Sequence, residues 1–324
     1  MRAAALAAAQ ASCAVADRSD LARLRADGPD FLDLLQRLST GDVRRLAIGE
    51  GAATVLTTAK GRIVDRLLVH RVREDRVLVV GSPGRSATVL AHLARFTFAE
   101  RTGLSDVTEG TVQLALLGPR AREAAAEAGL TVPPPLGAAV QTWSGVELTV
   151  LGQDGSSSEG VSLVVDREQG ATVHAAAAAL GPVLDGDGLE AWRIVRGLPG
   201  PGEMDEERNP LEAGLWDAVS FTKGCYVGQE VVARLRTYDK VVRHRVTLVL
   251  GQGTDVPPRG AELRQGERAM GTITSAVRPP GGGAPVAMGY LRREAAQAGA
   301  PVTVVWEGGT ADAVVSTVSP ARAA

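Results

Sequence analysis

The octapeptide KGCYVGQE, residues 223–230, carries the densest local information in this sequence. Gly224 and Gly228 bracket a cysteine and a tyrosine, and glycine lets a backbone turn sharply and approach a ligand closely. Gln229 and Glu230 then open an expected helix that has one apolar side. The octapeptide therefore predicts a tight turn that ends at a helix N-terminus.

Cys225 is the candidate reactive group of this turn. Lys223 lies just before it and Arg234 lies in the expected helix, and these charges, with the helix N-terminus, favour a reactive thiolate. Most free cysteines are instead small buried hydrophobes, but the polar and glycine neighbours of Cys225 are poor residues for a core. Cys13 lacks such neighbours and is assigned a structural role.

The residues on either side of the octapeptide are also informative. Asn209 and Pro210 are typical of a helix start, since asparagine caps a helix and proline fits its first turn, so a short helix is expected over residues 211–219. A basic cluster follows, and it suits an anionic ligand tail, an acidic partner or a solvated surface equally well. Its members are Arg234, Arg236, Lys240, Arg243 and Arg245.

The rest of the chain predicts mixed α and β structure followed by a small β domain. Apolar spacing predicts an Ala-rich helix within residues 1–16 and an amphipathic helix within residues 28–43. Strands joined by a hairpin at Lys60 and Gly61 follow, and a similar succession of strands and helices occurs again before residue 181. Past Tyr238 only short strand candidates remain, which predicts a separate barrel.

Composition excludes several classes of function. The 324 residues include 35 Lys and Arg against 37 Asp and Glu, a net charge of −2, so no global basic field attracts nucleic acid or an anionic membrane. No apolar run approaches the roughly 20 residues of a membrane-spanning helix. Two distant cysteines suit a reducing compartment, so we expect a cytoplasmic protein. The four histidines show no zinc-site spacing, and no metal site is expected.

The octapeptide and its flanks, NPLEAGLWDAVSFT before it and VARLR after it, closely resemble the signature of the YgfZ-type folate-binding proteins. These proteins are relatives of the aminomethyltransferase of the glycine cleavage system. The resemblance extends in order over most of the chain, including FLDLLQRLSTGDV near the start, AKGRIVDRLLV, LLGPRA and the terminal strands.

The resemblance implies an α+β fold. Two related α/β subdomains of the aminomethyltransferase folate-binding type would form residues 1–238, and a C-terminal β-barrel would form residues 239–324. In the family these parts surround a central hole that binds tetrahydrofolate, and the signature borders the hole. The functional positions carried over are Cys225 and Lys223, and the signature residues that would line the ligand are Gly224, Tyr226, Gly228, Gln229 and Glu230.

Two further residues are candidates from their position alone. Asp65 lies in a strand after the hairpin, where it either reaches a central ligand or makes a strand-edge salt bridge. Arg234 is the member of the basic cluster nearest to the signature, and it is a candidate for the anionic end of a folate.

The sequence also departs from the aminomethyltransferases at two places. Their Arg-x-Glu-x-Gly stretch binds the pterin through its glutamate, whereas Val195 occupies that position here, so Glu190, Glu203 or Asp65 would have to substitute. No carboxylate stands between Gly81 and Leu90, where the resemblance implies a catalytic aspartate. Aminomethyl transfer by the known mechanism is therefore not expected.

The resemblance implies three alternative functions. The leading one is a tetrahydrofolate-binding accessory protein that supports iron–sulfur cluster assembly or repair, with Cys225 as the functional thiol and iron–sulfur client proteins or assembly factors as partners. The second is a folate-dependent aminomethyltransferase or demethylase-like one-carbon transferase. The third is a binding scaffold that has lost its folate site.

Overall fold

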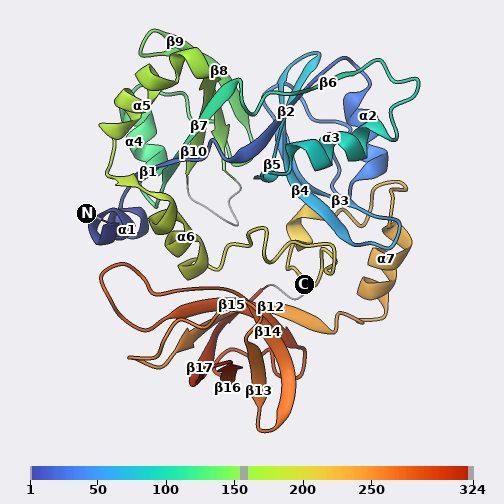
Figure 1. Ribbon diagram of the computed structural model, residues 1–324. Coiled ribbons are helices and arrows are strands. Elements are labelled where there is room, and N and C mark those ends of the chain that lie inside the picture. Colours follow the sequence, from blue (N-terminus) through green and yellow to red (C-terminus); the bar gives the residue numbers. More distant parts are fainter. Residues whose placement is uncertain (1, 154–159, 320–324) are drawn as a thin grey trace.

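A five-stranded antiparallel sheet forms one lobe of the computed structural model, which describes residues 2–153 and 160–319 (Figure 1). Its strand order is β3-β4-β5-β2-β6, and the predicted hairpin at Gly61 joins β3 to β4. The amphipathic pattern of α2 buries Phe31 and Leu35 against this sheet, as expected. The elements are β2 (Leu21–Asp27), α2 (Phe31–Leu38), β3 (Gly51–Thr57), β4 (Ile63–Arg73), β5 (Arg76–Pro83), α3 (Ser86–Ala94) and β6 (Gly103–Asp106).

A six-stranded sheet of order β11-β1-β7-β10-β9-β8 forms the second lobe. The Ala-rich N-terminal helix ends at Ala11, and the chain then enters β1, which pairs with β7 and β11. The elements are α1 (Arg2–Ala11), β1 (Ala14–Asp17), β7 (Thr111–Leu117), α4 (Ala121–Glu127), β8 (Ala138–Trp143), β9 (Val146–Gly152), β10 (Val161–Asp166), η1 (Arg167–Gln169), α5 (Gly170–Ala178), β11 (Val183–Leu184) and α6 (Gly186–Val195).

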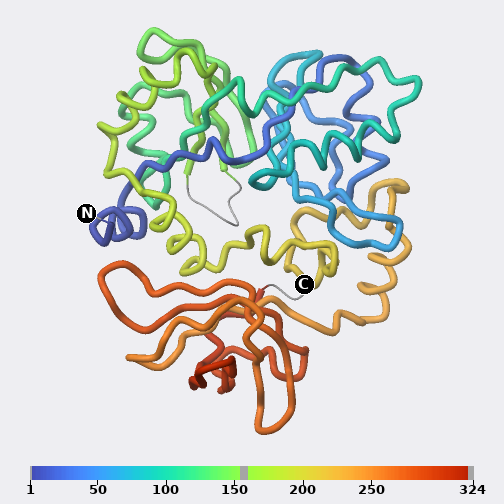
Figure 2. Tube along the Cα trace, in the orientation of Figure 1, coloured from blue at the N-terminus to red at the C-terminus, as the bar shows by residue number. Residues whose placement is uncertain are grey.

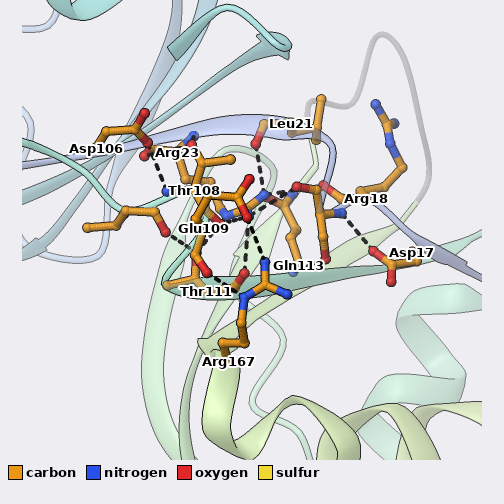
Figure 3. Close-up of polar contacts among 12 residues, drawn as sticks. Asp17, Arg18, Leu21, Arg23, Asp106, Thr108, Glu109, Thr111, Gln113 and Arg167 are labelled. Carbon is orange, nitrogen blue, oxygen red and sulfur yellow. Dashed lines mark hydrogen bonds and ion pairs between the residues drawn. The ribbon is translucent and has the colours of Figure 1, made fainter. Parts of the chain in front are cut away.

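The chain crosses between the two lobes twice. It leaves the six-stranded sheet at β1 and enters the five-stranded sheet at β2, and it returns between β6 and β7 (Figure 2). The two α/β units are therefore interleaved, because the first strand of the chain belongs to the sheet of the second unit. The segments that make these crossings, residues 18–20 and 107–110, lie beside each other at the junction (Figure 3).

Arg23 connects the two crossings. Its side chain is fully buried, and its guanidinium donates to Thr111 Oγ1 at 2.7 Å (Figure 3). Burial lowers the pKa of Arg23, and the negative charges of Asp20, Asp17 and Asp106 oppose this shift. The guanidinium also donates to backbone carbonyls of both crossings and of the strand residues next to them, namely those of Arg18, Ser19, Leu21, Thr108 and Thr111. One side chain therefore satisfies buried acceptors from two segments that are far apart in sequence.

A second contact between the lobes involves His70 in β4. The His70 ring is 1 % exposed, and its Nδ1 lies 2.8 Å from the carbonyl oxygen of Leu136, in the loop before β8. Gly51 pairs with His70 across β3 and β4, and a Cβ at Gly51 would lie only 2.1 Å from that oxygen. Glycine is therefore required here for the close approach of the two lobes.

The third part is a closed barrel of order β12-β15-β14-β13-β16-β17, as predicted (Figure 1). Its strands are β12 (Arg243–Leu250), β13 (Glu262–Gln265), β14 (Arg268–Val277), β15 (Val286–Arg292), β16 (Pro301–Trp306) and β17 (Gly309–Val318). The helix before it is α7 (Gln229–Thr237). The domain boundary at residues 238 and 239 stays a prediction.

The helix expected over residues 211–219 is wrong. Asn209 does cap a turn, because its Oδ1 accepts from the backbone N–H groups of Leu211 and Glu212. Gly214 then adopts φ +74 and ends the turn against the barrel, where a Cβ would lie 2.5 Å from Ser319. Only a short 3-10 helix, η2 (Trp216–Ala218), follows.

Two charged side chains attach the barrel to the long connection after α6. Arg245 of β12 donates to the carbonyl oxygens of Ala213, at 3.0 Å, and Gly197. Glu203 is fully buried, accepts from Arg193 at 2.9 Å, and accepts from Ser275 of β14 at 2.7 Å. No helix within the described residues is long and apolar enough to cross a membrane.

Arg23→Met is predicted to destabilise the protein strongly. Each buried carbonyl that loses its donor costs about 1–3 kcal/mol, so the free energy of unfolding should fall by about 3 kcal/mol or more. Arg73→Met is the matched control, since Arg73 also pairs between the lobes, with Glu147 at 3.2 Å, but is exposed and should cost below about 1 kcal/mol. Urea unfolding measures both. Equal losses in the two variants would contradict the role given to Arg23.

His70 is predicted to make the fold sensitive to acid. Burial lowers the pKa of His70 to about 4, whereas a histidine of the unfolded chain titrates near about 6.5. Between these values only the unfolded chain binds the proton, so stability is lost as the pH falls, on the order of 3 kcal/mol from this residue. The stability advantage of the native protein over His70→Asn should therefore shrink between pH 7 and pH 4.5 in denaturant unfolding. An advantage that does not change with pH would exclude this histidine as the acid-sensitive group.

Candidate functional site

A cavity of about 1240 Å³ lies where the two lobes, the connection after α6 and the barrel meet. Ordinary ligand pockets measure about 300–1,000 Å³, so the space accommodates a ligand with an extended tail. The five-stranded lobe contributes β4 and β5, and the six-stranded lobe contributes β7, β9 and β10. Part of the segment from residue 186 to residue 221 also lines it, as do Arg236 and the barrel residues Arg245, Thr247 and Thr317 to Ser319.

One face of β4 supplies a wall of this cavity. Successive side chains of a strand point to opposite faces, and Arg66, Leu68 and His70 share the face that lines the cavity. Burial lowers the pKa of Arg66, and the charge of Asp217 opposes that shift. An arginine and a histidine four residues apart, on one face of β4, are a signal that the sequence analysis missed.

Several polar atoms at the cavity wall are buried and have no hydrogen-bond partner among the described residues. Such atoms cost about 1–3 kcal/mol each unless a ligand or water satisfies them. They are three ring nitrogens, an amide oxygen and a hydroxyl, so the wall offers both donors and acceptors. The atoms are His70 Nε2, Gln113 Oε1, Trp192 Nε1, Trp216 Nε1 and Ser319 Oγ.

Asp65 lies directly behind the cavity wall. It is 1 % exposed, its Oδ1 accepts from Ser82 Oγ at 2.5 Å, and its Oδ2 accepts from the Ser82 backbone N–H at 3.0 Å. Burial raises the pKa of Asp65, and the hydrogen bonds from Ser82 oppose the rise. Ser82 lines the cavity, so a carboxylate supports the wall next to residues 81–90, although that segment contains none. Asp65 comes from the neighbouring strand β4, so the sequence of residues 81–90 alone could not indicate this carboxylate.

Glu190, Glu203 and Asp65 were expected to replace a pterin-binding glutamate at position 195, and they differ in whether they are free to contact a ligand in the cavity. Glu203 is committed to Arg193, Ser275 and the backbone N–H of Gly200. Glu190 lines the cavity from α6 and pairs with Arg193. Val195 is not among the described residues that line the cavity. Of these three residues, Glu190 is thus the one that lines the cavity.

The KGCYVGQE turn packs against the β3–β4 hairpin. Thr57 Oγ1 donates to the carbonyl oxygen of Val227 at 2.5 Å. Gly228 adopts φ +84 before α7, and a Cβ there would lie 2.6 Å from the carbonyl oxygen of Thr58 and 3.1 Å from Gly61. The turn and the helix start were therefore predicted correctly. Gly228 and Gly61 allow the turn and the hairpin to touch.

Lys223 holds the turn to the end of α2. Its Nζ donates to the carbonyl oxygens of Ser39, at 2.7 Å, and Gly41, at 2.5 Å. Burial lowers the pKa of Lys223 to about 8. The Nζ also lies 5.2 Å from the ring centroid of Tyr226, which is buried and whose pKa is raised to about 12 by that burial. Lys223 and Tyr226 thus stabilise the turn from inside.

Cys225 is exposed, whereas Cys13 is buried in the core of the six-stranded lobe. Gly224 is also exposed, and Glu230 pairs with Arg234 at 3.0 Å on the outer side of α7. None of residues 223–230 is among the described residues that line the cavity, although Phe221 and Arg236 on either side are. The structure therefore brings the signature residues together in a turn whose thiol faces outward.

The basic cluster does not form one surface. Arg245 is buried at the attachment of the barrel, and Arg236 lines the cavity with its guanidinium 4.0 Å from the ring centroid of Phe221. Arg234 and Arg243 are exposed. Arg236 is thus the member that could meet an anionic ligand inside the cavity.

Comparisons with known proteins agree with this architecture. Residues 2–223 match the GCVT N-terminal domain, and residues 243–320 match the glycine cleavage T-protein C-terminal barrel domain. A chloroplastic protein of Arabidopsis thaliana named "Putative transferase" is 30% identical, covering 90% of this chain and 68% of the relative. The aminomethyltransferase of Thermotoga maritima is 28% identical, covering 90% of this chain and 82% of the relative.

A solved structure shows the same fold. The crystal structure of the glycine cleavage system aminomethyltransferase T from Bartonella henselae superimposes with a TM-score of 0.84 at 21% identity, covering 98% of this chain and 88% of that chain. Both parts of the family pattern are therefore present in order, the two-lobed unit and the barrel. The chain belongs to the glycine cleavage T-protein family.

Proposed function

We propose that this protein binds tetrahydrofolate in the central cavity. The observation that carries the proposal is the group of buried polar atoms without partners at the cavity wall, of which His70 Nε2 and Gln113 Oε1 are examples. A pterin ring presents both donors and acceptors along its edges, which suits a wall of mixed polarity. Arg236 at the cavity supplies a positive charge for the carboxylates of the glutamate tail.

The residues of this chain fit that ligand without a glutamate at position 195. Glu190 offers a carboxylate from the same helix, α6, and Trp192 offers an indole N–H without a partner in the described residues. Tetrahydrofolate supplies a carrier for one-carbon groups when bound. The chain itself contributes the shape, the hydrogen-bonding groups and the exclusion of bulk water.

We further propose a YgfZ-type accessory role that supports iron–sulfur cluster assembly or repair in the cytoplasm. The support is the signature turn, which presents the exposed thiol of Cys225 on the outside of the molecule. A thiol in that position can meet a client protein or an assembly factor, which a thiol inside the cavity could not. Lys223 and Gly228 hold the turn in place.

A second candidate is folate-dependent one-carbon transfer, and one observation favours it. Asp65 supports Ser82 at the cavity wall and has a raised pKa. A carboxyl group in such a place can exchange a proton through the serine hydroxyl. Formation of 5,10-methylenetetrahydrofolate from an amine donor by the purified protein distinguishes this candidate from the accessory role.

Gln113→Met is predicted to weaken tetrahydrofolate binding without weakening the fold. Methionine has a similar size but no acceptor, so removing the unsatisfied oxygen leaves the free protein at least as stable, while the ligand loses a partner worth about 1.4 kcal/mol, or about tenfold in Kd. Calorimetric titration under anaerobic conditions measures the affinity, and a thermal melt measures the stability.

Gln141→Met is the control for this titration. Gln141 lies in β8 and bonds to Thr131, away from the cavity, so its replacement should leave Kd unchanged. No saturable binding by the native protein would reject the folate proposal and favour the scaffold alternative. Equal affinities of the native and Gln113→Met proteins would reject the part given to Gln113.

Cys225→Ala is predicted to fold, to bind tetrahydrofolate with native affinity, and to fail in cells. In cells that lack the native protein, this variant should not restore the activity of iron–sulfur enzymes, because only the exposed thiol is removed. Thr222→Ala changes the exposed residue just before this turn and should restore that activity. Full restoration by Cys225→Ala would show that the thiol is dispensable.

A further inference from the structure

His70 has one ring nitrogen that is fixed and one that is left without a partner. A carbonyl oxygen can only accept, so Nδ1, at 2.8 Å from the Leu136 oxygen, must carry the proton. Burial lowers the pKa of the ring to about 4, so the ring is neutral at physiological pH. In a neutral ring with a protonated Nδ1, Nε2 has only a lone pair. Within the described part of the chain, nothing donates to it.

The contact that fixes this tautomer requires an unusual backbone conformation at Leu136 and a residue without a Cβ at Gly51. Leu136 adopts φ +63, a conformation that residues with a bulky side chain rarely adopt. Gly51 leaves space beside the ring, since a Cβ there would lie 3.0 Å from His70 Nδ1 as well as 2.1 Å from the Leu136 oxygen. Strained positions of this kind persist where the surrounding structure imposes them, and they cluster at binding sites.

A purely structural role for His70 in the core explains these features less well. A histidine that only fills space in a core does not need a carbonyl acceptor from a strained residue on one nitrogen and an acceptor lone pair without a partner on the other. His70 also lines the cavity, on the same face of β4 as Arg66 and Leu68. The lone pair without a partner therefore belongs to a residue of the cavity wall.

We propose that His70 Nε2 accepts a hydrogen bond from a ring N–H or amino group of the bound heterocycle and thereby selects ligands that present a donor at that edge. This inference rests on the proposed folate site and adds which side chain reads the pterin ring. It makes His70 a specificity-determining residue, and it requires Leu136 and Gly51 only to hold the imidazole in the accepting tautomer.

Two substitutions separate the two nitrogens. His70→Asn places an amide N–H near the position of Nδ1 and removes the acceptor, whereas His70→Gln extends an amide oxygen toward the position of Nε2. Calorimetric titration with tetrahydrofolate should show affinity about tenfold weaker for His70→Asn and within about threefold of native for His70→Gln. Thermal melts of both variants verify that they fold.

A spectroscopic measurement tests the bond itself. In protein labelled with ¹⁵N-histidine, the Nε2 resonance of His70 should move upfield when tetrahydrofolate is added, while Nδ1 stays protonated. An unchanged Nε2 resonance with ligand bound, or equal affinities for native protein and His70→Asn, would overturn the inference alone and leave a water molecule as the partner of Nε2. Failure of the native protein to bind tetrahydrofolate would instead overturn the proposed function, and the inference with it.

Discussion

The buried guanidinium of Arg23 is the constraint on which the rest of the structure depends. It binds carbonyls from both segments that cross between the lobes, and so fixes the place where the two sheets meet. Because two short crossings, residues 18–20 and 107–110, join the lobes, the lobes can move apart only a short distance. The cavity lies between the faces that this junction holds opposite each other, so the shape of the site depends on a residue that does not line it.

The charged residues divide into those that hold the site together and those that face it. Glu203 and Arg245 are buried in contacts that attach the barrel to the connection after α6. Asp65 supports the wall through Ser82. Glu190 and Arg236 are the charged residues proposed to meet the ligand. The buried polar atoms without a partner at the cavity belong to neutral side chains, such as Gln113 and Trp192, which the sequence does not single out.

The sequence predicts the elements better than the assembly. The mixed α and β class, α2, the hairpin at Gly61, the start of α7 and the closed barrel all follow from local spacing and turn residues. The helix expected over residues 211–219 fails because Gly214 turns against the barrel, a contact between residues far apart in sequence. For the same reason the sequence could not show that Cys225 faces outward or that His70 faces the cavity, since both depend on how the parts pack.

The account as a whole requires one molecule of tetrahydrofolate between the lobes and the barrel, with the signature thiol outside. A crystal structure of the protein grown with tetrahydrofolate under anaerobic conditions tests this most directly. The account predicts density for the pterin ring within the cavity, in contact with His70 and Gln113, and more than a hydrogen bond's length from Cys225. A ligand bound at the KGCYVGQE turn, with an empty cavity, would contradict it.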